Sequence, residues 1–165
     1  MQIAFVLPSK RKQIKLGKVK PGTIVRFADS GKYVSGLSDA VANPKENLFV
    51  VFKDQKPTKG HTDLVSIDGQ HMFRRTNDRM VVIHGTLGGN THRNSTLSPK
   101  PVRISEVQPG ELAALPRSGD IFMIAKGAPL SNEKVSVISI DGNRIFFDDD
   151  LLIHVFPDAS INPEL

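Results

Sequence analysis

The chain carries the same sequence pattern twice, and this repeat limits its possible folds more than any other feature. The stretch KVKPGTIVRFADSGKYVSGL, residues 18–37, aligns without a gap with EVQPGELAALPRSGDIFMIA, residues 106–125. Farther along, Ser66-Ile67-Asp68-Gly69 recurs as Ser139-Ile140-Asp141-Gly142. A repeat of this length predicts that the chain folds as two related units.

Both units have the sequence features of β-structure. Short runs rich in Val, Ile and Phe, each bounded by Pro, Gly, Asp or Asn, are typical of strands. They occur at residues 23–27, 48–52, 64–67, 80–83, 121–125, 135–140 and 151–156. Asp68-Gly69 and Asp141-Gly142 each lie between two apolar runs, which is a strong hairpin signal because Gly accepts the positive φ of a type I′ turn.

We therefore expect an all-β fold of two small SH3-like or OB-like β-barrel domains related by the internal repeat. The first domain would span residues 1–86 and the second residues 101–165. Residues 87–100 are rich in Gly, Asn, Ser and Thr and cannot bury enough apolar surface to order themselves. They predict a flexible linker between the domains.

Composition argues against several classes of function. The chain has no Cys, which excludes disulfides, thiol chemistry and Cys-based zinc sites. Its five His residues show no metal-ligand spacing, and the consecutive carboxylates of Asp148-Asp149-Asp150 point in different directions, which predicts a solvated turn. Since no nucleophile can be paired with a base, we expect no enzyme activity, no metal and no cofactor. The lack of a signal sequence or a transmembrane-length apolar span predicts a cytoplasmic protein without a membrane partner.

Charge is distributed unevenly between the two units. The net charge is +5, but residues 1–97 contain 16 Lys and Arg against 7 Asp and Glu, whereas residues 98–165 contain 6 against 10. Crowding cations in one half opposes folding unless a polyanion is the partner. The asymmetry predicts that the first unit binds nucleic acid and that the second contributes little.

The predicted partner is double-stranded DNA, held through its phosphate backbone. Strand alternation directs Lys15 and Arg26 outward if their apolar neighbours point inward, so the cations would share one outer face. The candidate DNA-binding residues are Lys10, Arg11, Lys12, Lys15, Lys18, Lys20, Arg26, Lys32, Arg74, Arg75 and Arg79. Single-strand binding is less favoured, because only Tyr33 and Phe73 offer aromatic rings next to cations. No recognition helix is predicted, so base reading in the major groove is not expected.

The basic copy of the repeat resembles a known motif. PGTIVRFADSGKYVSG is similar to the KOW motif of small SH3-like barrels in ribosomal proteins and transcription elongation factors, and the matching positions are Gly22, Val25, Phe27, Gly31, Tyr33 and Gly36. After Gly36 the sequence departs from the motif, because residues 37–47 have the character of an inserted loop. At whole-chain level, the size, the basic first half, the linker and the smaller second half resemble the MotB family of early transcription modifiers from T-even-type bacteriophages.

That resemblance implies a phage protein that binds duplex DNA with little sequence preference and alters the host nucleoid and transcription. The host nucleoid is then the expected location, with a host transcription or nucleoid protein as a further partner. The alternative is a protein-interaction module in which the basic barrel docks on RNA polymerase, the ribosome or a host regulator, as KOW-like barrels also do. Salt-sensitive binding to random duplex DNA would separate the two hypotheses.

Overall fold

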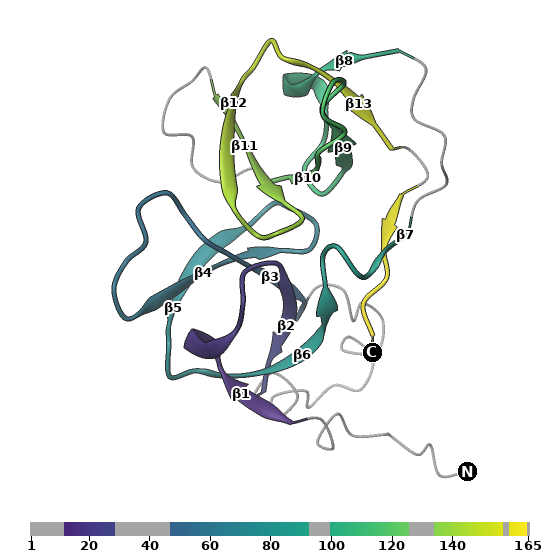
Figure 1. Ribbon diagram of the computed structural model, residues 1–165. Coiled ribbons are helices and arrows are strands. Elements are labelled where there is room, and N and C mark those ends of the chain that lie inside the picture. Colours follow the sequence, from purple (N-terminus) through teal and green to yellow (C-terminus); the bar gives the residue numbers. More distant parts are fainter. Residues whose placement is uncertain (1–11, 29–46, 93–99, 126–133, 157–158, 165) are drawn as a thin grey trace, which may run out of the picture.

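The chain folds as antiparallel β-structure. The computed structural model describes residues 12–28, 47–92, 100–125, 134–156 and 159–164, and within these ranges it is all-β (Figure 1). The strands form two six-stranded sheets and one two-stranded sheet, and neighbouring strands in each sheet are antiparallel. The prediction of an all-β fold is confirmed.

The first sheet has the strand order β1-β6-β2-β3-β4-β5. Its elements are β1 (Gln13–Lys15), the 3₁₀ helix η2 (Leu16–Lys18), β2 (Thr23–Phe27), β3 (Phe49–Phe52), β4 (His61–Ser66), β5 (Met72–Thr76) and β6 (Met80–Thr86). The second sheet has the order β12-β11-β10-β9-β13-β8. Its elements are β8 (Val102–Arg103), the 3₁₀ helix η4 (Ile104–Glu106), β9 (Leu112–Ala114), β10 (Ile121–Ile124), β11 (Lys134–Ser139), β12 (Arg144–Asp148) and β13 (Leu152–Val155). The third sheet pairs β7 (Thr91–His92) with β14 (Ser160–Ile161).

The two larger sheets have the same arrangement. Starting from β1 in one sheet and from β8 in the other, the strands follow in the same order. The backbone hydrogen bonds that begin η2 and η4 also match: the Leu16 amide donates to the Arg79 carbonyl (2.8 Å), and the Ile104 amide donates to the Leu151 carbonyl (2.8 Å). Each strand of the first sheet therefore has a counterpart in the second.

The expected closed barrels are not observed. In the described part of the chain, β1 does not pair with β5 and β8 does not pair with β12, so each six-stranded sheet keeps two open ends. Strands β1 and β8 have only three and two residues before the chain turns into η2 and η4. Such short strands leave too few backbone groups to complete a barrel by hydrogen bonding.

The central strands of the first sheet are buried on both faces. Residues that are paired directly across neighbouring strands point to the same face. One face presents Ile24, Val50 and Val65, and the other presents Val25, Val51 and Leu64. All six are at most 2% exposed, which explains why these strands are continuous apolar runs rather than alternating ones.

The two halves share one hydrophobic core. A single buried cluster contains Ile24 and Val65 from the first half together with Leu112, Met123 and Ile138 from the second. A separate cluster lies within each half, on the opposite faces of the two sheets. Because apolar burial is the main stabilising contribution to folding, the halves depend on each other for part of their stability.

Matched turns join the halves. The Pro21-Gly22 turn packs against the Asp141-Gly142 hairpin turn, and the Asp68-Gly69 hairpin turn packs against the Pro109-Gly110 turn. A Cβ added at Gly22 would lie 2.9 Å from the Ile140 carbonyl oxygen, and one added at Gly110 would lie 2.6 Å from the Asp68 carbonyl oxygen. The glycines of all four turns have φ between 73° and 89°. Both the close approach and the backbone conformation therefore require Gly.

A buried ion pair adds to this junction. The Lys53 amide donates to the Gly142 carbonyl (2.7 Å), and the Arg144 amide donates to the Lys53 carbonyl (3.0 Å). These bonds bring Arg144 Nη1 to 3.0 Å from Asp54 Oδ2, and the two side chains are only 10% and 15% exposed. Arg144 Nε also donates to the Ser136 hydroxyl (3.0 Å), so the charge of the guanidinium is compensated by two partners.

Part of the expected linker is ordered. Leu87 is fully buried in the shared core, and its amide donates to the Gly22 carbonyl (2.7 Å). Thr91 and His92 form β7, which pairs with β14, while the Asn162 amide donates to the Asn90 carbonyl (2.9 Å). Residues 87–92 thus differ from a flexible linker because one Leu anchors them in the core, and residues 93–99 lie outside the described part.

Candidate nucleic-acid interface

The turn between β5 and β6 lies against η2. The Gly17 amide donates to the Asn77 carbonyl (3.0 Å), and the Asn77 side-chain oxygen accepts a hydrogen bond from the Thr62 hydroxyl (2.6 Å). A side chain at position 17 would overlap Asn77, since an added Cβ would lie 2.6 Å from the Asn77 Cβ. Four cations of the first half lie on β1, η2, β5 and the β5–β6 turn, the segments around this contact, and we call them the basic rim: Lys15, Lys18, Arg75 and Arg79.

Two arginines of the basic rim stack on phenylalanines. Phe27, Phe49 and Phe73 form an aromatic cluster at the edge of the first half's own core, with ring centroids 4.9 to 6.3 Å apart. The Arg75 guanidinium carbon lies 4.6 Å from the centre of the Phe73 ring, and that of Arg79 lies 4.6 Å from the centre of the Phe27 ring. Cation–π attraction therefore restrains both guanidinium groups at the surface.

Arg74 is arranged differently. It precedes Arg75 on β5, and strand alternation places its side chain on the opposite face. Its Nε lies 2.6 Å from Asp63 Oδ1, and the Asp63 side chain is only 11% exposed. The hydrogen bond to Asp63 and the charge of that carboxylate raise the pKa of Arg74. Arg74 is thus paired with a carboxylate of the neighbouring strand β4.

The predicted DNA contacts that precede β5 differ in their exposure to solvent. Lys12, Lys15, Lys18 and Lys20 are exposed, whereas Arg26 is half-buried. Arg26 pairs with Val82 and Val82 with Gln13, so Arg26 points to the same sheet face as Lys15, as the alternation predicted. Lys10, Arg11 and Lys32 lie outside the described residues.

One carboxylate lies within the basic rim. A hydrogen bond from Thr76, one from its own backbone amide, and the charges of Lys15 and Arg79 together lower the pKa of Asp78, although burial opposes the shift. Asp78 is therefore ionised at neutral pH. It offsets part of the positive charge of the rim.

Three of the four basic-rim positions carry different kinds of side chain in the second half, whereas Lys15 corresponds to Arg103 and keeps its charge. Residues 73–79 are FRRTNDR and residues 145–151 are IFFDDDL. The Ser105 amide donates to the Asp149 carbonyl (3.3 Å), just as the Gly17 amide donates to the Asn77 carbonyl, so the two segments occupy equivalent places. Arg75 then corresponds to Phe147, Arg79 to Leu151, and Lys18 to Glu106. We call Glu106, Phe147, Asp149 and Leu151 the acidic–apolar rim.

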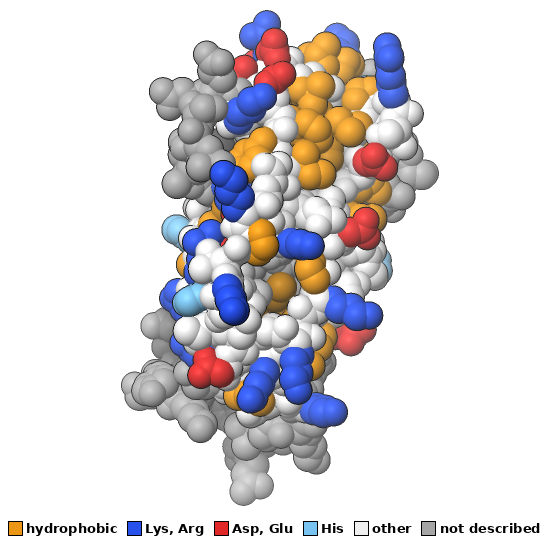
Figure 2. Space-filling model, turned by 60° about the vertical axis from the view of Figure 1, so that its left-hand side comes forward, with side chains coloured by type: hydrophobic (Ala, Val, Ile, Leu, Met, Phe, Trp, Pro, Cys, Tyr) orange, Lys and Arg blue, Asp and Glu red, His pale blue; other side chains and the backbone are white. Residues whose placement is uncertain are grey.

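The two halves consequently present different surfaces. In the space-filling view, Lys and Arg side chains gather over the lower, first half, whereas an apolar area covers the upper, second half (Figure 2). The half-buried apolar residues around the second half's own core include Val135, Ile145, Phe147 and Leu151. Phe147 packs on Phe122 with ring centroids 5.4 Å apart and, unlike Phe73, has no stacked arginine among the described contacts.

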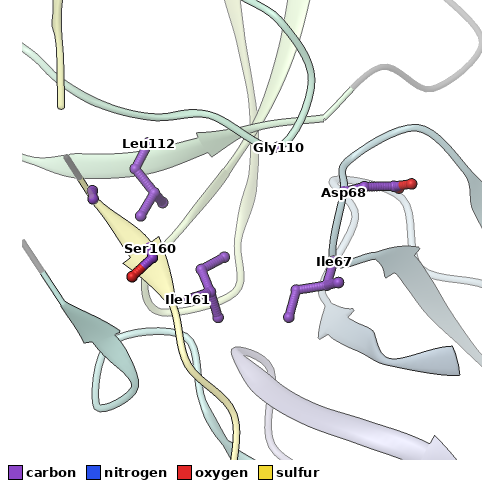
Figure 3. Close-up of a pocket in the computed structure, with 7 residues that line it drawn as sticks. Ile67, Asp68, Gly110, Leu112, Ser160 and Ile161 are labelled. Carbon is purple, nitrogen blue, oxygen red and sulfur yellow. The ribbon is translucent and has the colours of Figure 1, made fainter. Parts of the chain in front are cut away.

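A pocket of about 310 Å³ lies at the junction of the halves, between the β4–β5 turn and β14 (Figure 3). It is lined mainly by apolar groups, including Ile67, Leu112 and Ile161. Its carboxylate is Asp68, which accepts a short hydrogen bond from the Ser66 hydroxyl. Burial raises the pKa of Asp68, but the hydrogen bonds from Ser66 and Gln70 and the nearby His71 outweigh it, so the pKa is lowered overall. Asp68 thus stabilises the hairpin turn.

The described ranges contain neither a cluster of metal-binding side chains nor a helix that could span a membrane. No group of three or more His, Cys, Asp or Glu residues there is arranged to hold a metal ion. Nor does any helix in those ranges have the length and apolar character needed to cross a membrane.

Of the positions in the KOW-like motif, Gly22 contacts the second half, and Val25 and Phe27 pack in the first half's own core. Gly31, Tyr33 and Gly36 lie outside the described ranges.

No protein-family model matches the chain, and comparisons with curated proteins and with solved structures give no match either. The geometry of the two rims is therefore the basis for assigning a function. The sequence named Arg75 and Arg79 as candidate contacts but missed their stacking. One signal was available for Arg75: it lies two residues after Phe73, so on a strand both side chains share a face. The contact between Arg79 and Phe27 joins distant segments and left no local signal.

Proposed function

We propose that the chain is a nucleic-acid-binding protein whose first half holds the phosphates of duplex DNA without reading base sequence. The observation that carries this proposal is the basic rim, where Lys18, Arg75 and Arg79 occupy positions that are acidic or apolar in the second half. Exposed cations on a strand–turn surface suit phosphate contact, which needs charge and N–H donors but no recognition helix.

The stacked arginines favour this proposal over a merely solvated surface. A long flexible cation loses conformational entropy when it contacts a phosphate. Arg75 and Arg79 are already restrained by Phe73 and Phe27 at 4.6 Å, so less freedom remains to be lost. Guanidinium groups also donate two parallel hydrogen bonds to phosphate oxygens, which lysines do not.

The test is a salt titration of binding to two unrelated random duplexes. We expect Arg75→Ala combined with Arg79→Ala to lower affinity equally on both duplexes and to reduce the slope of log affinity against log salt by roughly 1.8, since each lost phosphate contact removes about 0.9. Lys12→Ala, Lys15→Ala and Lys18→Ala combined should act in the same direction. Arg74→Ala is the matched control, because Arg74 points to the sheet face opposite to Arg75 and is paired with Asp63.

An unchanged slope for both combined variants would reject the basic rim as the DNA contact. Loss of binding to one duplex but not the other would instead indicate base or shape readout. Absence of salt-sensitive binding to any duplex would favour the second candidate function, docking on RNA polymerase, the ribosome or a host regulator. The apolar surface around Phe147 and Leu151 is the observation that supports this second candidate.

We further propose that the halves are two small SH3-like units produced by an internal repeat, the first of them KOW-like. The shared strand order and the matching turns support this origin. In a cell, sequence-independent binding of this kind would place the protein on the nucleoid and allow it to influence transcription, as the resemblance to the phage MotB family implies.

A further inference from the structure

The Arg–Phe stacks of the first half have a second capability, and the inference rests on the proposed function. We propose that the Arg75–Phe73 and Arg79–Phe27 stacks hold unpaired bases of single-stranded nucleic acid, with the base lying on the guanidinium rather than on the ring. Sequence alone disfavoured single strands because few aromatic residues adjoin cations. In the structure, the guanidinium groups of Arg75 and Arg79 lie over the Phe73 and Phe27 rings, so a base would contact the guanidinium group.

The geometry of each stack suits a base. The guanidinium lies over the ring at 4.6 Å from the ring centre in both cases. Arg75 is exposed and Arg79 is half-buried, so the Arg75 guanidinium is the more accessible of the two. Unstacked bases pack on Arg guanidinium planes as well as on aromatic rings, and the N–H edge of the same group reaches a neighbouring phosphate.

The two stacks lie side by side. The Phe27 and Phe73 ring centroids are 6.3 Å apart, and Phe49 contacts both rings. Successive bases in a stacked strand are about 3.4 Å apart. The separation of the two rings is nearly twice that value, so the stacks suit two bases that have been splayed apart rather than two that remain stacked on each other. A duplex offers no such bases along its length, so the stacks would distinguish single strands from duplexes.

The second half supplies an internal comparison. Phe147 and Leu151 stand where Arg75 and Arg79 stand in the first half, so neither equivalent stack exists there. Arg74 supplies another comparison, since its guanidinium is held by Asp63. The second half also contains an Arg–Phe stack, since the Arg144 guanidinium carbon lies 4.7 Å from the centre of the Phe146 ring, but the Arg144 side chain is only 10% exposed and is paired with Asp54. The stack of the exposed Arg75 on Phe73 lies in the positively charged half, which links it to an anionic, flat partner.

The experiment compares two labelled 12-nucleotide strands, one of mixed sequence and one abasic strand with the same phosphates but no bases. Binding of the full chain is measured by fluorescence anisotropy at several salt concentrations, with duplex DNA and single-stranded RNA of the same sequence as further arms. The variant is Arg75→Lys combined with Arg79→Lys, which keeps both charges and removes both planar groups. Arg74→Lys is the matched control.

We expect the wild-type chain to bind the base-containing strand roughly tenfold more tightly than the abasic strand, in line with the usual energy of stacking one base. The double Lys variant should lose this preference. Its affinity for duplex DNA should fall because Lys lacks the two parallel donors of Arg, but its salt slope on duplex DNA should keep the wild-type value because both charges remain. Circular dichroism should show both variants folded. If the RNA strand and the base-containing DNA strand both bind more tightly than the abasic strand, the bases are the ligand group that the two share.

Equal affinity of wild type for the two strands, or an unchanged preference in the double Lys variant, would overturn the inference while leaving phosphate binding intact. Failure to bind duplex, abasic strand and mixed strand alike at low salt would instead reject the proposed function itself, and the stacking inference with it. The two failures are therefore distinguishable in one data set.

Discussion

Residues 73–79 and 145–151 occupy the same place in the two halves, yet one segment is FRRTNDR and the other IFFDDDL. Their main chains make equivalent hydrogen bonds to η2 and η4 and follow strands of the same order. Only the side chains differ, and they turn a basic rim into an acidic–apolar one. The comparison shows that the backbone framework of each half is set by turns and buried strands, whereas the rim residues can change without altering it.

The largest expected effect tests whether the halves are held together by their turns. Gly142 has φ of +83°, and a Cβ there would overlap the Gly22 amide nitrogen and Pro21. We expect Gly142→Ala to lower the free energy of unfolding by roughly 3 kcal/mol or more, from backbone strain together with overpacking. Urea unfolding followed by circular dichroism measures this loss.

The control for this prediction is Gly119→Ala. Gly119 also has positive φ, +71°, but no atom lies within 4 Å of its added Cβ. It should therefore lose only the strain contribution, about 1 kcal/mol. Equal losses in the free energy of unfolding for the two variants would mean that the close contact of Gly142 with Pro21 and Gly22 does not contribute to stability.

The second prediction compares a buried ion pair with an exposed one. Asp54→Ala leaves the guanidinium of Arg144 buried without its carboxylate, and we expect a loss of about 2 kcal/mol in the free energy of unfolding. Asp148→Ala removes the partner of Lys134, but those side chains are 69% and 47% exposed, so the loss should be about 0.3 kcal/mol. Thermal unfolding measures both, and a larger loss for Asp148→Ala would contradict the assigned junction.

The third prediction makes the acidic–apolar rim resemble the basic one. Phe147→Arg combined with Leu151→Arg places cations where the first half has Arg75 and Arg79. We expect tighter duplex binding and a salt slope steeper by roughly one to two units, because up to two more counterions are released. Phe147→Gln combined with Leu151→Gln is the uncharged control. No change in the charged variant would show that position on this framework is insufficient for phosphate contact.

The smallest expected effect concerns the hairpin turns. The pKa of Asp68 is lowered below its ordinary value of 3.8, so its ionised form adds stability above that value and the contribution disappears as the pH falls through the lowered pKa. Asp68→Asn should cost on the order of 0.5 kcal/mol at pH 7, since the group is largely exposed, and almost nothing in strong acid.

Asp141→Asn in the second half is the comparison for the hairpin prediction. There the Ser139 hydroxyl accepts a hydrogen bond from the Asn143 amide (3.1 Å), whereas the Ser66 hydroxyl donates to Asp68. The Asp141 variant should therefore lose less stability at pH 7. Unfolding curves collected at several pH values measure both variants, and a constant cost for Asp68→Asn at every pH would contradict the assignment.

The sequence predicted the all-β class because its signals are local: short apolar runs and Asp-Gly turns. It could not predict the shared core. A run such as residues 48–52 indicates burial on both faces, but it carries no information on which distant strand covers each face. Leu87 illustrates the same limit, since one apolar residue within a polar segment anchors that segment in the core.

Strand register was also hidden from the sequence. In the sequence, the shared Ile-His ending aligns His84 with His154. In the structure, however, Val81 pairs with Ile14 as Ile153 pairs with Val102. His154 therefore corresponds to Val82, two residues earlier than His84. The first hairpin turn has one residue more than the second, because the Ser66 amide bonds to His71 whereas the Ser139 amide bonds to Asn143. Small insertions of this kind shift the register that local matching assumes.

The matched turns also bear on how such a molecule can evolve. Pro-Gly and Ser-Ile-Asp-Gly are identical in both copies, and their glycines are the positions that touch the opposite half. If the halves descend from one duplicated unit, a change in either turn would require a compensating change in its counterpart, which slows divergence there. The rims have no such constraint, because each faces away from the junction. Duplication would thus have preserved the turns through which the two copies contact each other, while the residues on their outer surfaces could change separately.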